Sequence, residues 1–252
     1  MYDASTPVIC CFKEIRFKLS RQQVHSIKWR TSKARELFAY LLHHRGQTVY
    51  RDQLVKLLWA DMEEEKAAKQ LHTSIYHIRQ TLKSLELNLR IAYSWGKVPG
   101  YRLEMQAMKV DVEEWERAVN CLDKPCSQSV AAYEHVLHAY EGDYLGSYDY
   151  QWAVQERQRY RRLWLLHMRE LSRYYEREGN IRKAIAVNQH VQQLLPDECE
   201  SCFSLMKLFH QTGDRELVEE QYEQLRSQMS ANQKAERLRD VAAWYEQWKK
   251  CD

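Results

Sequence analysis

Residues 66–85 constrain the fold of this chain more than any other stretch of its sequence. The apolar residues follow a spacing of four and three in turn, which places them on one side of an α-helix: Leu71, Ile75, Ile78, Leu82 and Leu85. The other side is polar and carries Lys69, Gln70, Thr73, Tyr76, His77 and Gln80. Such a helix packs one flank on a small domain and leaves hydrogen-bonding groups on the other.

The residues around this helix predict a small α+β domain. Thr31 or Ser32 can cap a helix over 33–44, and Gly46 can end it. A short extended piece follows at 47–49, and then a second helix over 51–59. Strands are expected at 11–17, 24–29, 89–93 and 101–103, the last two joined by a turn at 94–100. The expected order is therefore strands, three helices and a terminal hairpin.

After Val110 the pattern is helical throughout. Segments 112–122, 128–140, 152–178, 181–195, 198–211, 215–229 and 234–250 are expected to be helices. Within them a pattern recurs after 34 residues: Tyr175, Gly179, Ala184 and Val191 return as Phe209, Gly213, Val218 and Leu225. This period resembles the tetratricopeptide repeat, whose helix pairs must stack on neighbours to bury their apolar faces.

The net charge of +3 conceals an asymmetry between the two ends of the chain. Residues 1–103 hold 18 Lys+Arg and 9 Asp+Glu, a balance of +9, and the remainder holds 20 and 26, a balance of −6. A basic N-terminal segment suits contact with a polyanion, although random surface variation is the competing explanation.

Composition also indicates the compartment. No apolar run has the length of a membrane span, and the first residues lack the pattern of a secretory signal. The odd number of cysteines, 7, suits a reducing cytoplasm. Cys199 and Cys202 form a lone CxxC, which we interpret as two free thiols; metal binding or redox chemistry is the alternative. No metal or cofactor is expected.

A helix with the polar flank of residues 66–85 can enter the major groove of DNA. Its Thr, Tyr, His and Gln side chains can bond base edges or phosphate oxygens, and Lys69 and Arg79 can neutralise phosphates. The hairpin turn offers Trp95 and Lys97 to the adjacent backbone. The alternative is an ordinary solvated helix face.

Several motifs resemble those of known regulators. Residues 33–59 are similar to the first two helices of the OmpR/PhoB-type winged helix, residues 78–82 (IRQTL) match the Leu-Arg-x-x-Leu of its recognition helix, and residues 100–103 (GYRL) match the end of its wing. Residues 111–115 (DVEEW) and 140–145 (YEGDYL) resemble motifs of the bacterial transcriptional activation domain. Together they cover nearly the whole chain in the order of the SARP class of regulators.

This resemblance implies a winged helix-turn-helix DNA-binding domain over 1–105 and an all-α, TPR-like activation domain over 106–252. It implies a recognition helix at about 67–83 and a wing at about 89–103, with DNA contacts from Lys69, Thr73, Tyr76, His77, Arg79 and Lys97. Gln80 and Trp95 complete the expected site from the residues themselves. Tyr76 and His77 stand where the family usually has arginines, which would weaken phosphate anchoring.

The expected function is a cytoplasmic transcription regulator that binds double-stranded DNA as a homodimer, with RNA polymerase as a further partner by family analogy. A receiver domain precedes many such winged helices, so the chain is expected to be the output part of a longer two-component regulator. No phosphate-binding glycine loop, GxSxG or HExxH supports an enzyme. The competing hypothesis is a TPR-like interaction scaffold, since aromatics are dense between Tyr133 and Tyr175.

Overall fold

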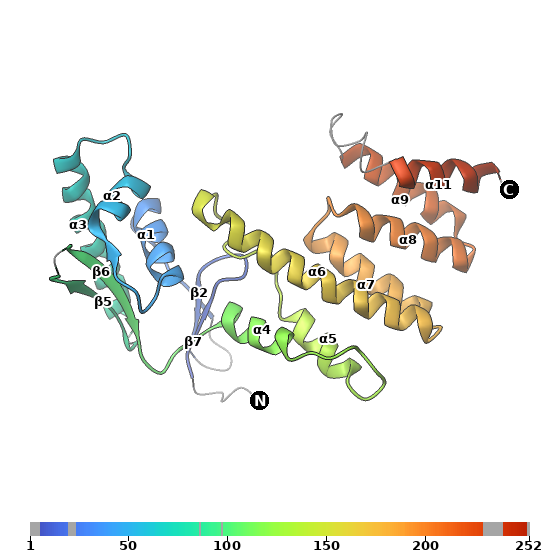
Figure 1. Cartoon of the computed structure of the whole chain (residues 1–252), viewed down its shortest axis with the longest axis horizontal. Coiled ribbons are helices and arrows are strands. Elements are labelled where there is room, and N and C mark those ends of the chain that lie inside the picture. The colour runs from blue at the N-terminus through green and yellow to red at the C-terminus, as the bar shows by residue number, and fades with distance from the viewer. Residues whose placement is uncertain (1–5, 20–23, 86, 97, 229–238, 251–252) are drawn as a thin grey trace. The chain divides into compact units, whose positions relative to one another are not determined.

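The computed structural model describes residues 6–19, 24–85, 87–96, 98–228 and 239–250. The chain divides into two compact units, each built from two stretches of sequence (Figure 1). The N-terminal unit comprises Met1–Glu114 and Tyr144–Val154, and the helical unit comprises Trp115–Asp143 and Gln155–Asp252. The expected fold class, a winged helix-turn-helix followed by a TPR-like helical part, is confirmed.

The N-terminal unit begins with a four-stranded sheet in the order β3-β2-β1-β7. Strands β1 (Val8–Cys10), β2 (Arg16–Lys18) and β3 (Val24–Ser26) pair antiparallel. Strand β7 (Lys109–Val110) pairs parallel with β1, which fixes the segment after the hairpin against the first strand. The side chains of Ile9 and Phe17 are fully buried in this sheet's core.

The predicted strand at 11–17 is wrong in its position. Residues 11–15 form the turn between β1 and β2, and Lys13 takes a left-handed conformation with φ of 68°. The backbone N–H groups of Cys11 and Phe12 donate to the carboxylate of Asp111 instead of to a neighbouring strand. The alternation of apolar residues in this segment therefore reflects a buried turn.

The three predicted helices of the small domain are confirmed. Helix α1 (Ser32–His43) is capped by Thr31, whose hydroxyl accepts the N–H of Ala34 at 3.0 Å, and it is followed by α2 (Arg51–Leu58) and α3 (Glu64–Lys83). A second sheet has the order β4-β6-β5, with bounds Val49–Tyr50, Gly100–Met105 and Leu89–Ser94. Both hairpin strands are longer than predicted.

Gly100 lets strands β4 and β6 approach closely. A Cβ at this position would lie 2.6 Å from the carbonyl oxygen of Val49 and 2.7 Å from Cγ2 of Thr48. Ala at this position would force the backbone apart, because real Cβ contacts are not this short. The Gly-Tyr-Arg-Leu sequence therefore begins with a residue that the sheet itself requires.

The stretch Tyr144–Val154 returns to the N-terminal unit and lies along its first turn and α1. The backbone N–H groups of Leu145 and Ser147 donate to the carbonyls of Cys11 and Lys13, each at 2.8 Å. Arg35 lies over the ring of Tyr148 at 4.2 Å and donates to the hydroxyl of Tyr150 at 3.1 Å. The short 3-10 helix η1 (Gln151–Ala153) ends the stretch.

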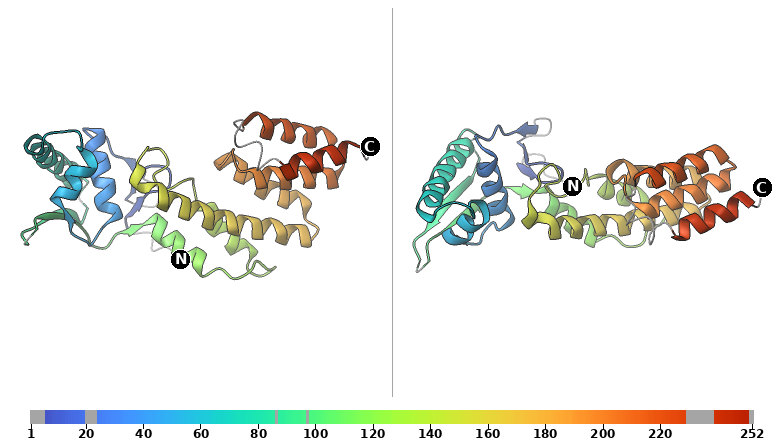
Figure 2. Two further views of the ribbon diagram at one scale, coloured as in Figure 1. Left: turned by 45° about the horizontal axis from the view of Figure 1, so that its top comes forward. Right: turned by 90° about the horizontal axis from the view of Figure 1, so that it is seen from above.

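Helices α4 to α9 and α11 follow in antiparallel succession (Figure 2). Their bounds are Asp111–Asn120, Val130–His138, Val154–Arg177, Ile181–Leu194, Cys199–Thr212, Arg215–Gln228 and Arg239–Lys250. The start predicted for the last one, near 234, lies outside the described residues. Most of the dense aromatic side chains are core, including the fully buried Trp164, which stacks on Tyr140 at 4.7 Å.

The 34-residue repeat is a structural repeat. Gly179 and Gly213 both take left-handed φ values, 71° and 80°, at the ends of α6 and α8. In each turn the residue after the glycine donates to the carbonyl of the buried aromatic residue, Tyr175 at 2.8 Å and Phe209 at 2.9 Å. The paired apolar positions Ala184 and Val218 are fully buried, so α6–α7 and α8–α9 are equivalent hairpins.

Candidate nucleic-acid interface

Helix α3 has one buried flank and one exposed flank. The buried flank comprises Ala67, Leu71, Ser74, Ile75, Ile78 and Leu82. Lys69, Thr73, Tyr76 and Gln80 are exposed at spacings of four and three, and Tyr76 is 58% exposed. His77 is half-buried beside them. These five side chains therefore lie on a common surface of α3, which we call the α3 polar flank.

Local contacts hold the α3 polar flank in place without covering it. The ammonium of Lys69 lies 2.7 Å from a carboxylate oxygen of Glu65, one turn earlier. The hydroxyl of Thr73 donates to the backbone carbonyl of Lys69 at 3.0 Å, and its oxygen can still accept a hydrogen bond. Surface ion pairs of this kind contribute little, so Lys69 can exchange its carboxylate for a phosphate at small cost.

Arg79, expected among the DNA contacts, faces the hairpin. Its Nε and Nη2 donate to the backbone carbonyl of Ile91 in β5, at 3.2 and 2.8 Å. Sequence reasoning could not find this contact, because it depends on where the hairpin packs against α3.

The wing, defined as β5, β6 and the turn between them, carries an exposed indole at its tip. Trp95 is 88% exposed and contacts the ring of Tyr93 edge-on at 4.5 Å. Tyr93 in turn contacts Tyr101 at 5.2 Å. Lys97, the other expected wing contact, lies outside the described residues.

His72 was not among the predicted site residues, yet it joins α3 to the wing. Its Nδ1 lies 3.2 Å from the hydroxyl of Tyr101 in β6. Burial raises the pKa of Tyr101, so the phenol that pairs with His72 stays protonated.

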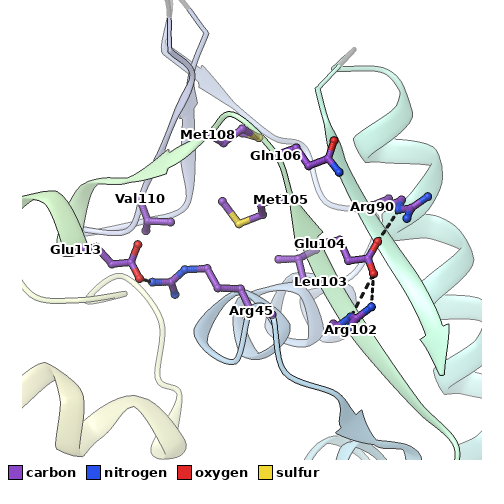
Figure 3. A pocket seen from close by; sticks show the side chains of 11 residues that line it. Arg45, Arg90, Arg102, Leu103, Glu104, Met105, Gln106, Met108, Val110 and Glu113 are labelled. Carbon is purple, nitrogen blue, oxygen red and sulfur yellow. Dashed lines mark hydrogen bonds and ion pairs between the residues drawn. The ribbon is translucent and has the colours of Figure 1, made fainter. Parts of the chain in front are cut away.

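A cavity of about 580 Å³ lies on the other side of the wing, in the N-terminal unit. Figure 3 shows Arg45 reaching toward Glu113, and Arg90 and Arg102 reaching toward Glu104. Arg45 is thus paired with Glu113, whereas Arg90 and Arg102 share the single carboxylate of Glu104.

The two cysteines of the CxxC lie in α8. Cys202 is buried, and its sulfur accepts the side-chain N–H of Gln192 at 2.9 Å, whereas Cys199 is half-buried. Among the described residues no three His, Cys, Asp or Glu side chains are grouped as metal ligands would be. Nor does any helix in the described part of the chain have the length and apolarity to cross a bilayer.

Comparisons with known proteins agree with this geometry. Residues 27–103, which contain α1 to α3 and most of the wing, match the family described as "Transcriptional regulatory protein, C terminal". The structure of Mycobacterium tuberculosis EmbR, solved in complex with a low affinity phosphopeptide, is similar at a TM-score of 0.57 and 17% identity. That similarity covers 88% of this chain and 59% of the EmbR chain, and at this identity it shows a shared fold. Comparison with curated proteins finds no matching relative.

Proposed function

We propose that the chain binds DNA in a sequence-specific manner, because residues 27–103 match the family described as "Transcriptional regulatory protein, C terminal". Helix α3 docks in the major groove, and the wing lies along the neighbouring backbone. One observation carries the proposal: α3 is anchored by an apolar flank and leaves a flank of hydrogen-bonding side chains exposed beside an exposed wing tip.

The residues of the α3 polar flank divide by chemistry. Lys69 suits a phosphate, because an ammonium contributes charge without reading sequence. Thr73, His77 and Gln80 suit base edges, where hydroxyl, imidazole and amide groups pair with donors and acceptors in the major groove. Tyr76 presents both a ring and a hydroxyl, and Trp95 and Lys97 suit the sugar–phosphate backbone near the wing.

The helical unit supplies the other half of regulation in this proposal. Two copies of the chain bind adjacent half-sites, because linked binding raises affinity without any new contact. The helical unit then contacts the partner copy or RNA polymerase and activates transcription. Stacked helix pairs such as α6–α7 and α8–α9 offer the extended surface that such contacts need.

Binding to a selected duplex tests the proposal. The chain is used to select sequences from random double-stranded DNA, and affinity for the selected duplex is measured at several salt concentrations. We expect affinity to fall steeply with salt, and Lys69→Ala to lower the slope of log K against log salt by about one. Lys124→Ala, a surface lysine of the helical unit, serves as the matched control and leaves the slope unchanged.

Base readout has its own signature. His77→Ala and Thr73→Ala should each cost roughly 1–3 kcal/mol on the selected duplex and change the preferred sequence. If both Lys69→Ala and His77→Ala bind and protect the duplex as the wild type does, α3 is not the reading helix.

The alternative is a TPR-like scaffold that binds proteins and does not read DNA. The stacked helix pairs of the helical unit favour it. A scaffold would select no common sequence from random DNA and would show no steep salt dependence.

A further inference from the structure

Arg79 makes two hydrogen bonds to the middle of the wing. Two of its three guanidinium nitrogens, Nε and Nη2, donate to one acceptor, the carbonyl oxygen of Ile91. The side chain of Ile91 is 4% exposed, so this part of β5 is held in the core of the domain. These two hydrogen bonds therefore join α3 to a buried part of the hairpin.

Strand β6 is also bonded to the rest of the domain, at the residue that pairs with Ile91. Ile91 faces Leu103 in the β5–β6 register, and the carbonyl of Leu103 accepts the backbone N–H of Gly46 at 3.1 Å. Both carbonyls of this residue pair thus bond to groups outside the hairpin, one to α3 and one to the loop after α1.

His72 provides a second tie between α3 and the wing. It bonds the hydroxyl of Tyr101 in β6, whereas Arg79 bonds the backbone of β5. Positions 72 and 79 lie about two helical turns apart on the same side of α3. Ring contacts continue from Tyr101 through Tyr93 to Trp95, so the ties at the base are connected to the wing tip.

From these contacts we propose that Arg79 is a positioning residue, which fixes the wing relative to α3 instead of contacting phosphate. A helix in the major groove and a wing on the adjacent backbone bind together only if the distance and angle between them are set beforehand. The inference rests on the proposed DNA binding, but the state of the wing can be measured without DNA.

The DNA-free experiment compares Arg79→Lys and Arg79→Gln with the wild type. The measurement is ¹⁵N relaxation of the backbone amides of residues 92–96. We expect their order parameters to fall from about 0.85 toward about 0.6 in both variants, because neither side chain reproduces the two-donor fork. Lys83→Gln, the same loss of charge in the last turn of α3, leaves them unchanged. Unchanged order parameters in both Arg79 variants overturn the proposal, whatever the chain does with DNA.

The DNA experiment separates positioning from phosphate binding. Affinity is measured for the selected duplex and for a duplex shortened by the base pairs beneath the wing. Loss of positioning weakens binding to the full duplex by about tenfold in both variants, with an unchanged salt slope, and leaves binding to the short duplex as it was. A general loss of folding would weaken both duplexes equally, and thermal unfolding checks for it.

A phosphate contact predicts the reverse pattern. Arg79→Gln would then lower the salt slope by about one, and Arg79→Lys would restore it, because the ammonium keeps the charge. That result would overturn the positioning role. If the wild type binds no duplex, the proposed function fails, while the relaxation measurement still decides whether Arg79 holds the wing.

Discussion

The carboxylate of Asp111 accepts the backbone N–H of Cys11 at 2.7 Å, although the two residues are 100 positions apart in the sequence. The same carboxylate accepts the N–H of Phe12 at 3.2 Å and that of Val112 at 2.7 Å. One side chain thus satisfies three backbone donors and joins the β1–β2 turn to the start of α4. The Asp that opens the DVEEW motif therefore has a structural role.

Replacing Asp111 with Asn should destabilise the N-terminal unit by about 1–3 kcal/mol. The amide retains one acceptor oxygen, but its NH₂ group then faces a backbone N–H that has lost its partner. Urea unfolding measures the change. Asp123→Asn, on an exposed loop, is the matched control and should be neutral. Equal stabilities for the two variants would contradict this role of Asp111.

Gly100→Ala should destabilise the chain by about 1–3 kcal/mol, because the added methyl group overlaps the backbone of β4. Gly96→Ala is the control, since its Cβ would meet only the carbonyl oxygen of Val98, at 3.9 Å. The midpoint of thermal unfolding gives the comparison. A stable Gly100→Ala variant would mean that β4 and β6 separate easily at this point.

The stability of the chain should decrease as the pH falls below the ordinary histidine value of 6.5. Burial lowers the pKa values of His44, His167 and His190, so the unfolded chain takes up protons before the folded chain does. The stabilisation is complete above 6.5 and is lost between 6.5 and the lowered values. Urea unfolding at about pH 7.5 and about pH 5.5 measures the loss.

His167→Asn isolates one of these groups. His167 lies 2.7 Å from the hydroxyl of Tyr133, and asparagine retains a polar partner without a titrating ring. This variant should lose less stability on acidification than the wild type. A larger loss in His167→Asn than in the wild type would refute the assignment.

Cys126 should be alkylated first among the cysteines at Cys11, Cys126 and Cys202. The hydroxyl of Ser129 lies 3.1 Å from its sulfur and lowers the pKa of the thiol, while burial raises the pKa values of the other two. Mass spectrometry after brief iodoacetamide treatment gives the order. Ser129→Ala should slow the reaction at Cys126. Modification of Cys11 or Cys202 before Cys126 would contradict the prediction.

The elements that were predicted correctly are those with a periodic local signal. The spacing of Leu71, Ile75 and Ile78 fixes both the existence of α3 and the direction of its buried flank. The glycines at 179 and 213 likewise mark turns that the structure repeats. Such features are predictable because they depend on residues within a few turns of one another.

The features that the sequence left hidden depend on contacts between distant segments. The parallel pairing of β1 with β7 and the bonds of Asp111 involve residues about a hundred positions apart. The bond from Arg79 to Ile91 has the same origin, since an arginine on a polar helix flank gives no sign of which backbone it reaches. A side chain can be assigned to a surface from its spacing, but its partner follows only from packing.

The two-part composition of the N-terminal unit has a consequence for its biosynthesis. The stretch Tyr144–Val154 supplies partners for the turn after β1 and for Arg35, so the unit lacks these contacts until that stretch has left the ribosome. Helix α1 and the β1–β2 turn must therefore wait for α4 and α5 to be translated before their packing is complete. Folding of the N-terminal unit therefore depends on prior synthesis of α5, which belongs to the helical unit.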